Sequence, residues 1–174
     1  MNDIKYSYVY VEIPEPFRSG ILTYANELIE KDQLTEQGLE TDPHVTIKYG
    51  IKTNDVGEVA KALGKFNPIR LMFGITSVFI ADDIHDYDVV KIDIFGLTLS
   101  KLRKSITDNL NTVDQYKLFY PHITLGFVEP KTAIKYIGTN PVMGEKVVVD
   151  SVVFSNMDKV KWRIKNDGSI IDYA

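Results

Sequence analysis

The sequence contains two copies of a short pattern in which a histidine stands two residues before a threonine. Residues 43–49 read PHVTIKY and residues 121–127 read PHITLGF, so Pro, His and Thr are identical in both copies. The histidines, His44 and His122, lie 122 − 44 = 78 residues apart. Imidazole titrates near neutral pH, so one neutral and one protonated histidine in a shared site can accept and donate a proton. The pair is therefore a candidate general base and general acid.

Both copies lie in runs that are typical of β-strands. Side chains alternate between the two faces of a strand, so each histidine shares a face with the threonine of its own motif. If the apolar residues between them pack on a core, two imidazoles and two hydroxyls line the open side of a sheet. Hydroxyls in such a site can donate hydrogen bonds to a ligand. We interpret the catalytic set as His44, Thr46, His122 and Thr124.

The elements that carry the motifs follow the same order in both halves of the chain: a helix, a motif strand, a short helix and a further strand. This order indicates an internal pseudo-repeat and an α/β (α+β) fold over residues 1–174, with two lobes whose mostly antiparallel sheets line a central groove and whose helices lie outside. The expected helices cover residues 17–31, 54–63 and 98–110 and a short stretch after Pro130; the expected strands cover residues 5–13, 44–51, 69–80, 87–95, 121–128 and 147–154, with a hairpin over 160–171.

The composition limits the classes of partner. Net charge is −4 and the pI is near 5.4, so no global basic field favours a long nucleic acid. The chain has no Cys, which excludes disulfides and thiolate metal sites. We find no apolar run of membrane-spanning length and no signal-peptide pattern at the start. We expect a cytoplasmic protein that binds a small anionic ligand and neither a membrane nor a long nucleic acid.

The motifs resemble those of the 2H (two-histidine) phosphoesterases, which carry two His-x-Thr/Ser motifs on the central strands of a bilobal fold. Residues 43–47 (PHVTI) and 121–125 (PHITL) match that pattern, and the bilobal order covers most of the chain. Within the family, residues 38–46 (GLETDPHVT) are similar to the phage anti-CBASS nucleases, which degrade cyclic oligonucleotide alarms of bacterial immunity. The resemblance implies a 2H phosphoesterase-like fold and a metal-independent phosphodiesterase without a cofactor.

The resemblance also implies a substrate: the 3′–5′ bonds of a cyclic di- or trinucleotide second messenger, cut in the host bacterial cytoplasm if the protein is phage-encoded. With a ribose substrate the adjacent 2′-OH can be the nucleophile, which gives a 2′,3′-cyclic phosphate. Two other functions fit the same motifs. One is RNA-end processing by opening of a 2′,3′-cyclic phosphate, and the other is a sponge that binds cyclic nucleotides without cutting them. Binding alone does not require two proton-transfer groups, so the intact motifs favour an enzyme.

Three further side chains are candidate substrate-binding residues. Alternation places Lys48 on the face of His44 and Thr46, where its charge can meet a phosphate; the alternative is a solvated lysine at a strand end. Tyr10 shares a strand face with Tyr6 and Tyr8, so it is either a base-stacking residue or ordinary strand packing. Trp162, the only Trp, either stacks on a base or anchors the hairpin near the C-terminus, and we favour the anchor.

No metal site is expected. His44 and His122 alone do not supply the three or four protein ligands that zinc requires. His85 lies in the acidic stretch 82–88, which lacks the spacing of a calcium loop and its closing Glu, so we interpret the stretch as a turn.

Overall fold

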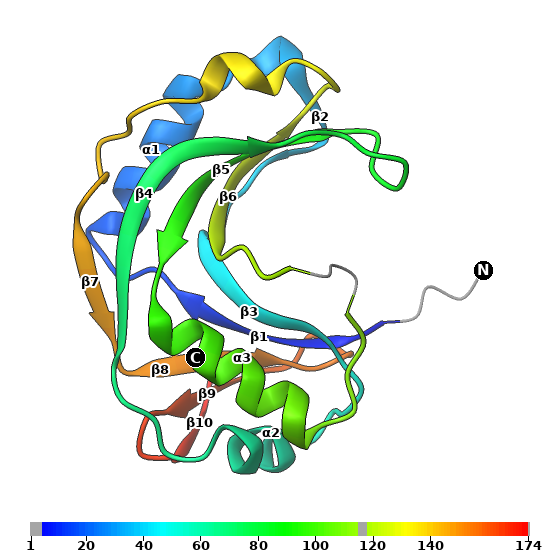
Figure 1. Ribbon diagram of the computed structural model, residues 1–174, viewed down its shortest axis with the longest axis vertical. Coiled ribbons are helices and arrows are strands. Elements are labelled where there is room, and N and C mark those ends of the chain that lie inside the picture. Colours follow the sequence, from blue (N-terminus) through cyan, green and yellow to red (C-terminus); the bar gives the residue numbers. More distant parts are fainter. Residues whose placement is uncertain (1–4, 115–117, 174) are drawn as a thin grey trace.

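The computed structural model describes residues 5–114 and 118–173, and within them all strands join one curled antiparallel sheet. The sheet forms a C-shaped trough that is open on one side (Figure 1). Its strands run in the order β10-β9-β8-β1-β3-β6-β5-β4-β7, and β2 pairs with β6 beside this path. The strands are β1 (Ser7–Glu12), β2 (Leu34–Leu39), β3 (His44–Ile51), β4 (Ile69–Phe79), β5 (Asp88–Phe95), β6 (His122–Val128), β7 (Lys146–Val149), β8 (Ser151–Ser155), β9 (Lys161–Lys165) and β10 (Ile170–Asp172).

The helices interlock the two halves of the chain. Helix α1 (Phe17–Leu28) follows β1 but contacts β6, whereas α3 (Leu97–Asn109) follows β5 but contacts β3 and β4. Helix α2 (Val56–Leu63) packs against α3. Each motif strand is therefore supported by the helix from the other half, which couples the positions of the two motifs.

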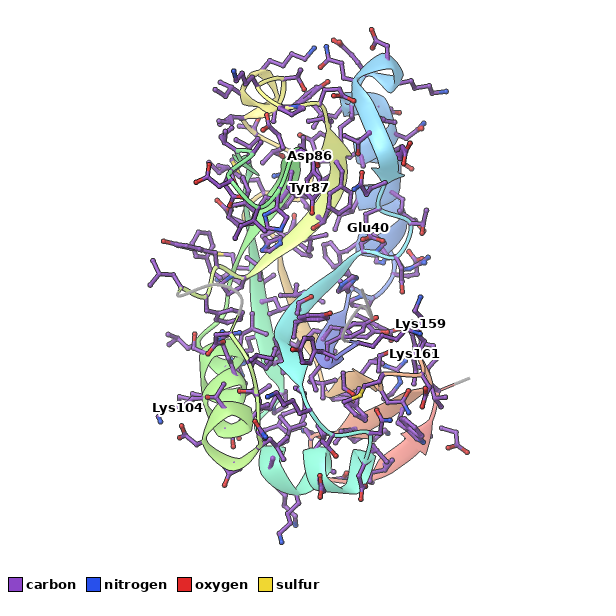
Figure 2. The ribbon with its side chains drawn as sticks, turned by 90° about the vertical axis from the view of Figure 1, so that its right-hand side faces the viewer. Glu40, Asp86, Tyr87, Lys104, Lys159 and Lys161 are labelled. Atoms are coloured by element: carbon purple, nitrogen blue, oxygen red, sulfur yellow. The ribbon has the colours of Figure 1, made fainter. Side chains whose placement is uncertain are left out.

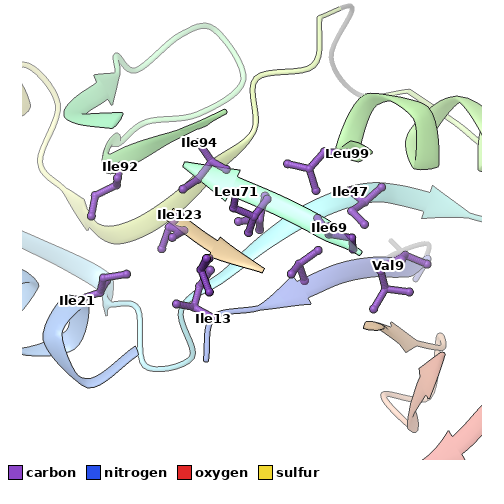
Figure 3. Close-up of a cluster of buried hydrophobic side chains, with 14 of the residues drawn as sticks. Val9, Ile13, Ile21, Ile47, Ile69, Leu71, Ile92, Ile94, Leu99 and Ile123 are labelled. Carbon is purple, nitrogen blue, oxygen red and sulfur yellow. The ribbon is translucent and has the colours of Figure 1, made fainter. Parts of the chain in front are cut away.

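The core lies on the face of the sheet opposite the open side of the trough. Figure 3 shows part of it, a cluster of aliphatic side chains from the central strands and both long helices. Val45 and Ile47 of β3 and Ile123 and Leu125 of β6 are at most 1% exposed. Burial of these alternating residues fixes which face of each motif strand points into the trough, because a slip of one residue would expose them all.

Most expected elements are present, and four details differ. The predicted strand 147–154 is two strands separated by Asp150, and they pair with different neighbours: β7 with β4, and β8 with β1 and β9. The curl of the sheet brings these distant neighbours together, which no local pattern encodes. Strand β2 lies in a stretch that we expected to be a loop. The expected helix 54–63 begins only at Val56, because the carboxylate of Asp55 caps it by accepting from Gly57 N at 2.7 Å. The stretch after Pro130 forms only a 3₁₀ turn, Ala133–Tyr136.

Among the residues that the structure describes, none forms a helix of the length and apolar character needed to cross a bilayer.

Candidate active site

The two His-x-Thr motifs meet on neighbouring strands at the centre of the sheet. Strands β3 and β6 are antiparallel, and their register pairs Val45 with Ile123. Each histidine immediately precedes one member of that pair, at the first residue of its strand. The structure thus brings His44 and His122 together, close enough that a positive charge on His44 disfavours one on His122. It also places Thr46 and Thr124 two residues further along each strand.

Each histidine is held by a backbone carbonyl two residues before it. His44 Nδ1 lies 2.7 Å from the Asp42 carbonyl oxygen, and His122 Nδ1 lies 2.7 Å from that of Tyr120. A carbonyl can only accept, so in both residues Nδ1–H is the donor. Nε2 is therefore the nitrogen that gains or loses a proton in both rings. It can act as a base in the neutral ring and as an acid in the charged ring.

An aromatic ring supports each imidazole from the side. Tyr10 contacts His44 and Phe79 contacts His122, both edge-on with ring centroids 5.0 Å apart. Together with the Nδ1 hydrogen bonds, these contacts restrict both rings to one orientation.

The strand pairs β1–β3 and β5–β6 repeat one another in register, including a β-bulge at the same place. In the first, Val9 pairs with Lys48 and Tyr10 with Thr46, so β3 carries one extra residue, Ile47. In the second, Val90 pairs with Gly126 and Lys91 with Thr124, so β6 carries the extra residue Leu125. The pseudo-repeat inferred from the motifs therefore extends to the neighbouring strands.

The bulge changes the strand neighbour of Lys48. Simple alternation placed Lys48 on the face of His44 and Thr46, but the extra residue puts it opposite the buried Val9. Its side chain is 1% exposed, and Nζ donates to the Val113 carbonyl at 2.6 Å and to Asp114 Oδ1 at 2.7 Å. Lys48 thus fastens the segment before β6 to β3.

The matching position in the other half has no room for a side chain. A Cβ on Gly126 would lie 3.0 Å from Ile29 Cδ1 and 3.2 Å from Leu39 Cδ2. Strand β2 and the end of α1 occupy the space that Lys48 fills in the first half. This contact explains why the two motifs differ at this position.

A groove of about 610 Å³ lies on the open side of the sheet and contains most of the site. Thr46, Lys48, His122 and Thr124 line it. Arg103 and Asp114 line it as well, and the Nη2 of the first lies 2.6 Å from Oδ1 of the second. Figure 2 looks into this side of the molecule and shows Tyr87 in its upper half. Aromatic side chains form much of the wall: Tyr49, Phe79, Tyr87, Phe119, Tyr120 and Phe127. Such a surface can stack nucleobases.

The other two predicted binding residues are packed into the protein. Tyr10 is 1% exposed, and within the described part of the chain its hydroxyl has no hydrogen-bond partner. Burial raises the pKa of the Tyr10 hydroxyl well above its usual range, with Glu12 adding to the effect. Trp162 stacks on Phe154 with ring centroids 5.9 Å apart, and it is not among the residues that line the groove.

Two ionic clusters lie beside the histidines, and the sequence did not predict them. Glu12, opposite His44, accepts from Arg163 Nη2 at 2.6 Å and from the hydroxyl of Tyr173. Asp93, opposite His122, accepts from Lys91 Nζ at 2.5 Å and from Ser77 Oγ at 2.6 Å. Alignment of β1 with β5 through the repeat would have identified Glu12 and Asp93 as counterparts. Lys91 lies on the same strand as Asp93 and Ser77 on the adjacent β4, whereas Arg163 reaches Glu12 from β9.

The environment of His122 disfavours its charged form. Burial lowers the pKa of the His122 imidazole, and the positive charges of Lys91 and His44 lower it further. The hydrogen bond to the Tyr120 carbonyl and the carboxylate of Asp93 act in the opposite direction without restoring the usual value. Within residues 5–114 and 118–173, no three His, Cys, Asp or Glu side chains form a metal-binding group.

Comparison with solved structures shows the same fold in proteins of very different sequence. TT0787 of Thermus thermophilus matches with a TM-score of 0.60 and 13% identity over 97% of this chain and 95% of the other. Escherichia coli LigT in complex with 3′-AMP matches with a TM-score of 0.59 and 13% identity over 98% and 95%. Usb1 of Kluyveromyces marxianus with uridine monophosphate matches with 0.56 and 9% over 96% and 97%. The 2H phosphoesterase-like fold is confirmed.

No protein-family model matches the sequence, and no curated protein matches it. The likeness is therefore one of structure rather than of sequence.

Proposed function

We propose that this protein is a phosphodiesterase in which His44 and His122 are general base and general acid. The observation that carries the proposal is the paired geometry of the histidines: adjacent strands, matched Nδ1 hydrogen bonds to carbonyls, and therefore two Nε2 atoms free for proton transfer. Thr46 and Thr124 share the open face of the sheet and can donate to the phosphate. The fold that the chain shares with LigT and Usb1 supports this function.

The reaction follows from these groups. One imidazole removes the proton of a ribose 2′-OH, the 2′-oxygen bonds to phosphorus, and the P–O5′ bond breaks as the other imidazolium protonates the leaving oxygen. The products are a 2′,3′-cyclic phosphate and a free 5′-OH. Water then opens the cyclic phosphate with the two histidines in exchanged roles. The proton transfers need only the two side chains, and no cofactor enters the scheme.

The substrate we propose is a cyclic di- or trinucleotide second messenger, whose cleavage would counter CBASS immunity. The similarity of residues 38–46 to the phage anti-CBASS nucleases supports this choice, and an aromatic groove of about 610 Å³ suits a small ligand with two or three bases. Lys48, Tyr10 and Trp162 are the proposed substrate-binding residues; Lys48 lines the groove, whereas Tyr10 and Trp162 support its wall through the contacts described above.

A second candidate is an RNA-end 2′,3′-cyclic phosphodiesterase. The specific observation in its favour is that LigT and Usb1 were captured with the mononucleotides 3′-AMP and uridine monophosphate, respectively. An end-processing enzyme would use the same histidines, but it would need room for only one nucleotide beside them.

A cleavage panel separates these functions. Purified protein in EDTA is incubated with cyclic dinucleotides, cyclic trinucleotides, a 2′,3′-cyclic-phosphate RNA end and linear RNA, and the products are resolved by chromatography. Linearised cyclic messengers support the first proposal. Opening of the RNA end alone supports the second. Tight binding of a messenger without cleavage identifies a sponge and contradicts both.

A further inference from the structure

The two halves of the site differ in charge at one matched position. Tyr10 faces Thr46 in the β1–β3 pair, whereas Lys91 faces Thr124 in the β5–β6 pair. The flanking residues correspond in type. A valine comes directly before Tyr10 and before Lys91, and an acidic residue comes two positions after each of them. The repeat therefore preserves geometry on both sides but places a buried lysine at the position beside His122 where a tyrosine stands beside His44.

The ammonium group of Lys91 is held in a fixed place. Nζ donates to Ser77 Oγ at 2.6 Å and to Asp93 Oδ1 at 2.5 Å, and it lies 4.3 Å from the centroid of Phe79. Phe79 in turn contacts the ring of His122, and Lys91 is only 5% exposed. Low exposure weakens solvent screening, so this charge acts strongly on its neighbours.

The charges around His122 come from three elements. Strand β5 contributes Lys91 and Asp93, β3 contributes His44, and the segment before β6 contributes the Tyr120 carbonyl that accepts from Nδ1. Asp93 Oδ1 already accepts from Lys91 and from Ser77. Lys91 and Asp93 therefore partly offset each other, and the effect of Lys91 on the His122 imidazole is the larger of the two.

The cation nearest the ring that contacts His44 is more exposed than Lys91. Lys161 Nζ lies 5.5 Å from the centroid of Tyr10 and 3.9 Å from Asp42 Oδ2, and its side chain is 29% exposed, as against 6% for Lys91. Tyr10 itself is a neutral phenol, because burial raises the pKa of that hydroxyl. The carboxylate of Glu12, opposite His44, is bound by Arg163 and Tyr173. Arg163 is thus engaged with Glu12 in the place where Lys91 is engaged with Asp93, but it reaches in from β9.

We propose that Lys91 is a positioning residue that makes His122 the general base and His44 the general acid of the bond-breaking step. This inference rests on the proposed phosphodiesterase function and deepens it by giving the substrate a direction. His122 Nε2 takes the proton of the 2′-OH, the 2′-oxygen bonds to phosphorus, the P–O5′ bond breaks, and His44 Nε2–H protonates the leaving 5′-oxygen.

The nucleoside that carries the attacking 2′-OH therefore lies on the His122 side. The groove wall on that side includes Phe79, Tyr87 and Phe127, and the last two contact each other edge-on at 5.3 Å. These rings give the base of that nucleoside a stacking surface. The leaving nucleoside extends toward His44.

A substrate with sulfur in place of the leaving 5′-oxygen tests the direction. A thiolate leaves without being protonated, so loss of the general acid no longer matters. We expect H44A to lose about 10²–10⁴-fold in rate on the oxygen substrate and to recover most of the loss on the sulfur substrate. H122A should stay slow on both. Recovery by H122A instead of H44A would overturn the assignment.

NMR titration of the two imidazoles tests the role of Lys91 without any substrate. K91M should raise the pKa of His122, K91R should keep it near the wild-type value, and K104M, an exposed lysine paired with Asp108, should leave it unchanged (Figure 2). An unchanged His122 titration in K91M would contradict the inference. If K91M does not fold, K91Q retains a donor for Asp93 and gives the same comparison. An inactive wild type with the expected titration would refute the proposed function alone.

Discussion

Val45 of β3 pairs with Ile123 of β6, and both side chains are fully buried. This one pair aligns two segments that are 78 residues apart in sequence and places a histidine directly before each member. Because the apolar residues face the core, the histidines and threonines must face the open side of the sheet. The site thus depends on the register of β3 against β6, and its chemistry can be tested residue by residue.

Replacement of the ribose that carries the attacking 2′-OH tests whether this hydroxyl is the nucleophile. We predict that a dinucleotide with a 2′-deoxyribose on the attacking side resists cleavage, because it lacks the hydroxyl that bonds to phosphorus. Product analysis by ³¹P NMR should show a 2′,3′-cyclic phosphate from the ribose substrate. Comparable cleavage of the deoxy substrate would show that water attacks directly.

The motif threonines should contribute to the rate rather than to folding. T46V and T124V keep a β-branched side chain on each strand but remove the hydroxyl that donates to the phosphate. We expect kcat to fall about 10²-fold in each, as for loss of one donor to a developing charge, with little change in KM. T46S and T124S should retain most activity. A large rise in KM at constant kcat would instead indicate ground-state binding.

Activity should persist on the acid side of neutrality. A general base must be neutral in the free enzyme, and burial together with Lys91 holds the pKa of His122 below the usual 6.5. The acidic limb of the kcat/KM profile therefore lies below pH 6.5, and K91M should move it upward toward that value. A wild-type limb above this usual value would contradict His122 as the base.

The ion pair between Lys48 and Asp114 gives a prediction about stability. Lys48 is 1% exposed, whereas Asp114 is 53% exposed and also binds Arg103. D114A leaves a buried ammonium with only the Val113 carbonyl, so we expect a loss of about 1–3 kcal/mol in chemical denaturation. K48M removes the buried charge itself and should cost less, because Asp114 keeps Arg103 and solvent. The reverse order would contradict this account.

The same pair links stability to pH. The hydrogen bond from Lys48 lowers the pKa of Asp114, with Arg103 adding to the effect. A carboxyl with a lowered folded-state pKa stabilises the protein above its unfolded value near 3.8, and that contribution disappears as the pH falls through the folded-state pKa. D114A should therefore lose less stability than wild type between about pH 5 and pH 2, as measured by chemical denaturation at each pH. Parallel acid curves for the two proteins would exclude this role.

Trp162 provides a test between binding and packing. Its ring stacks on Phe154, a fully buried residue of β8. We predict that W162A lowers the midpoint of thermal unfolding and leaves KM unchanged, whereas W162F retains most of the stability. An increase in KM in a stable W162F variant would indicate that Trp162 binds the substrate.

The sequence predicted most of the strands because their apolar residues alternate and their ends carry turn residues. It also located both motifs, since the copies are nearly identical. It could not predict the bulge at Ile47, because an extra residue in a strand changes no local pattern, and the burial of Lys48 opposite Val9 was missed for that reason. Arg163 was missed as a partner of Glu12 because it belongs to β9, which the sheet joins to β1 only through β8. Ser77 was missed as a partner of Asp93 because the register of β4 on β5 is needed to place it there.

The rates of H44A, H122A and the double variant on a cleaved cyclic dinucleotide test the central claim most directly. If the two imidazoles act as one acid–base pair, each single replacement lowers kcat/KM by about 10²–10⁴-fold. The double replacement then costs little more than either one, because residues that act as a unit are not additive. Unchanged thermal unfolding would confirm that the variants are folded. Near wild-type activity in either single variant would contradict the two-histidine mechanism.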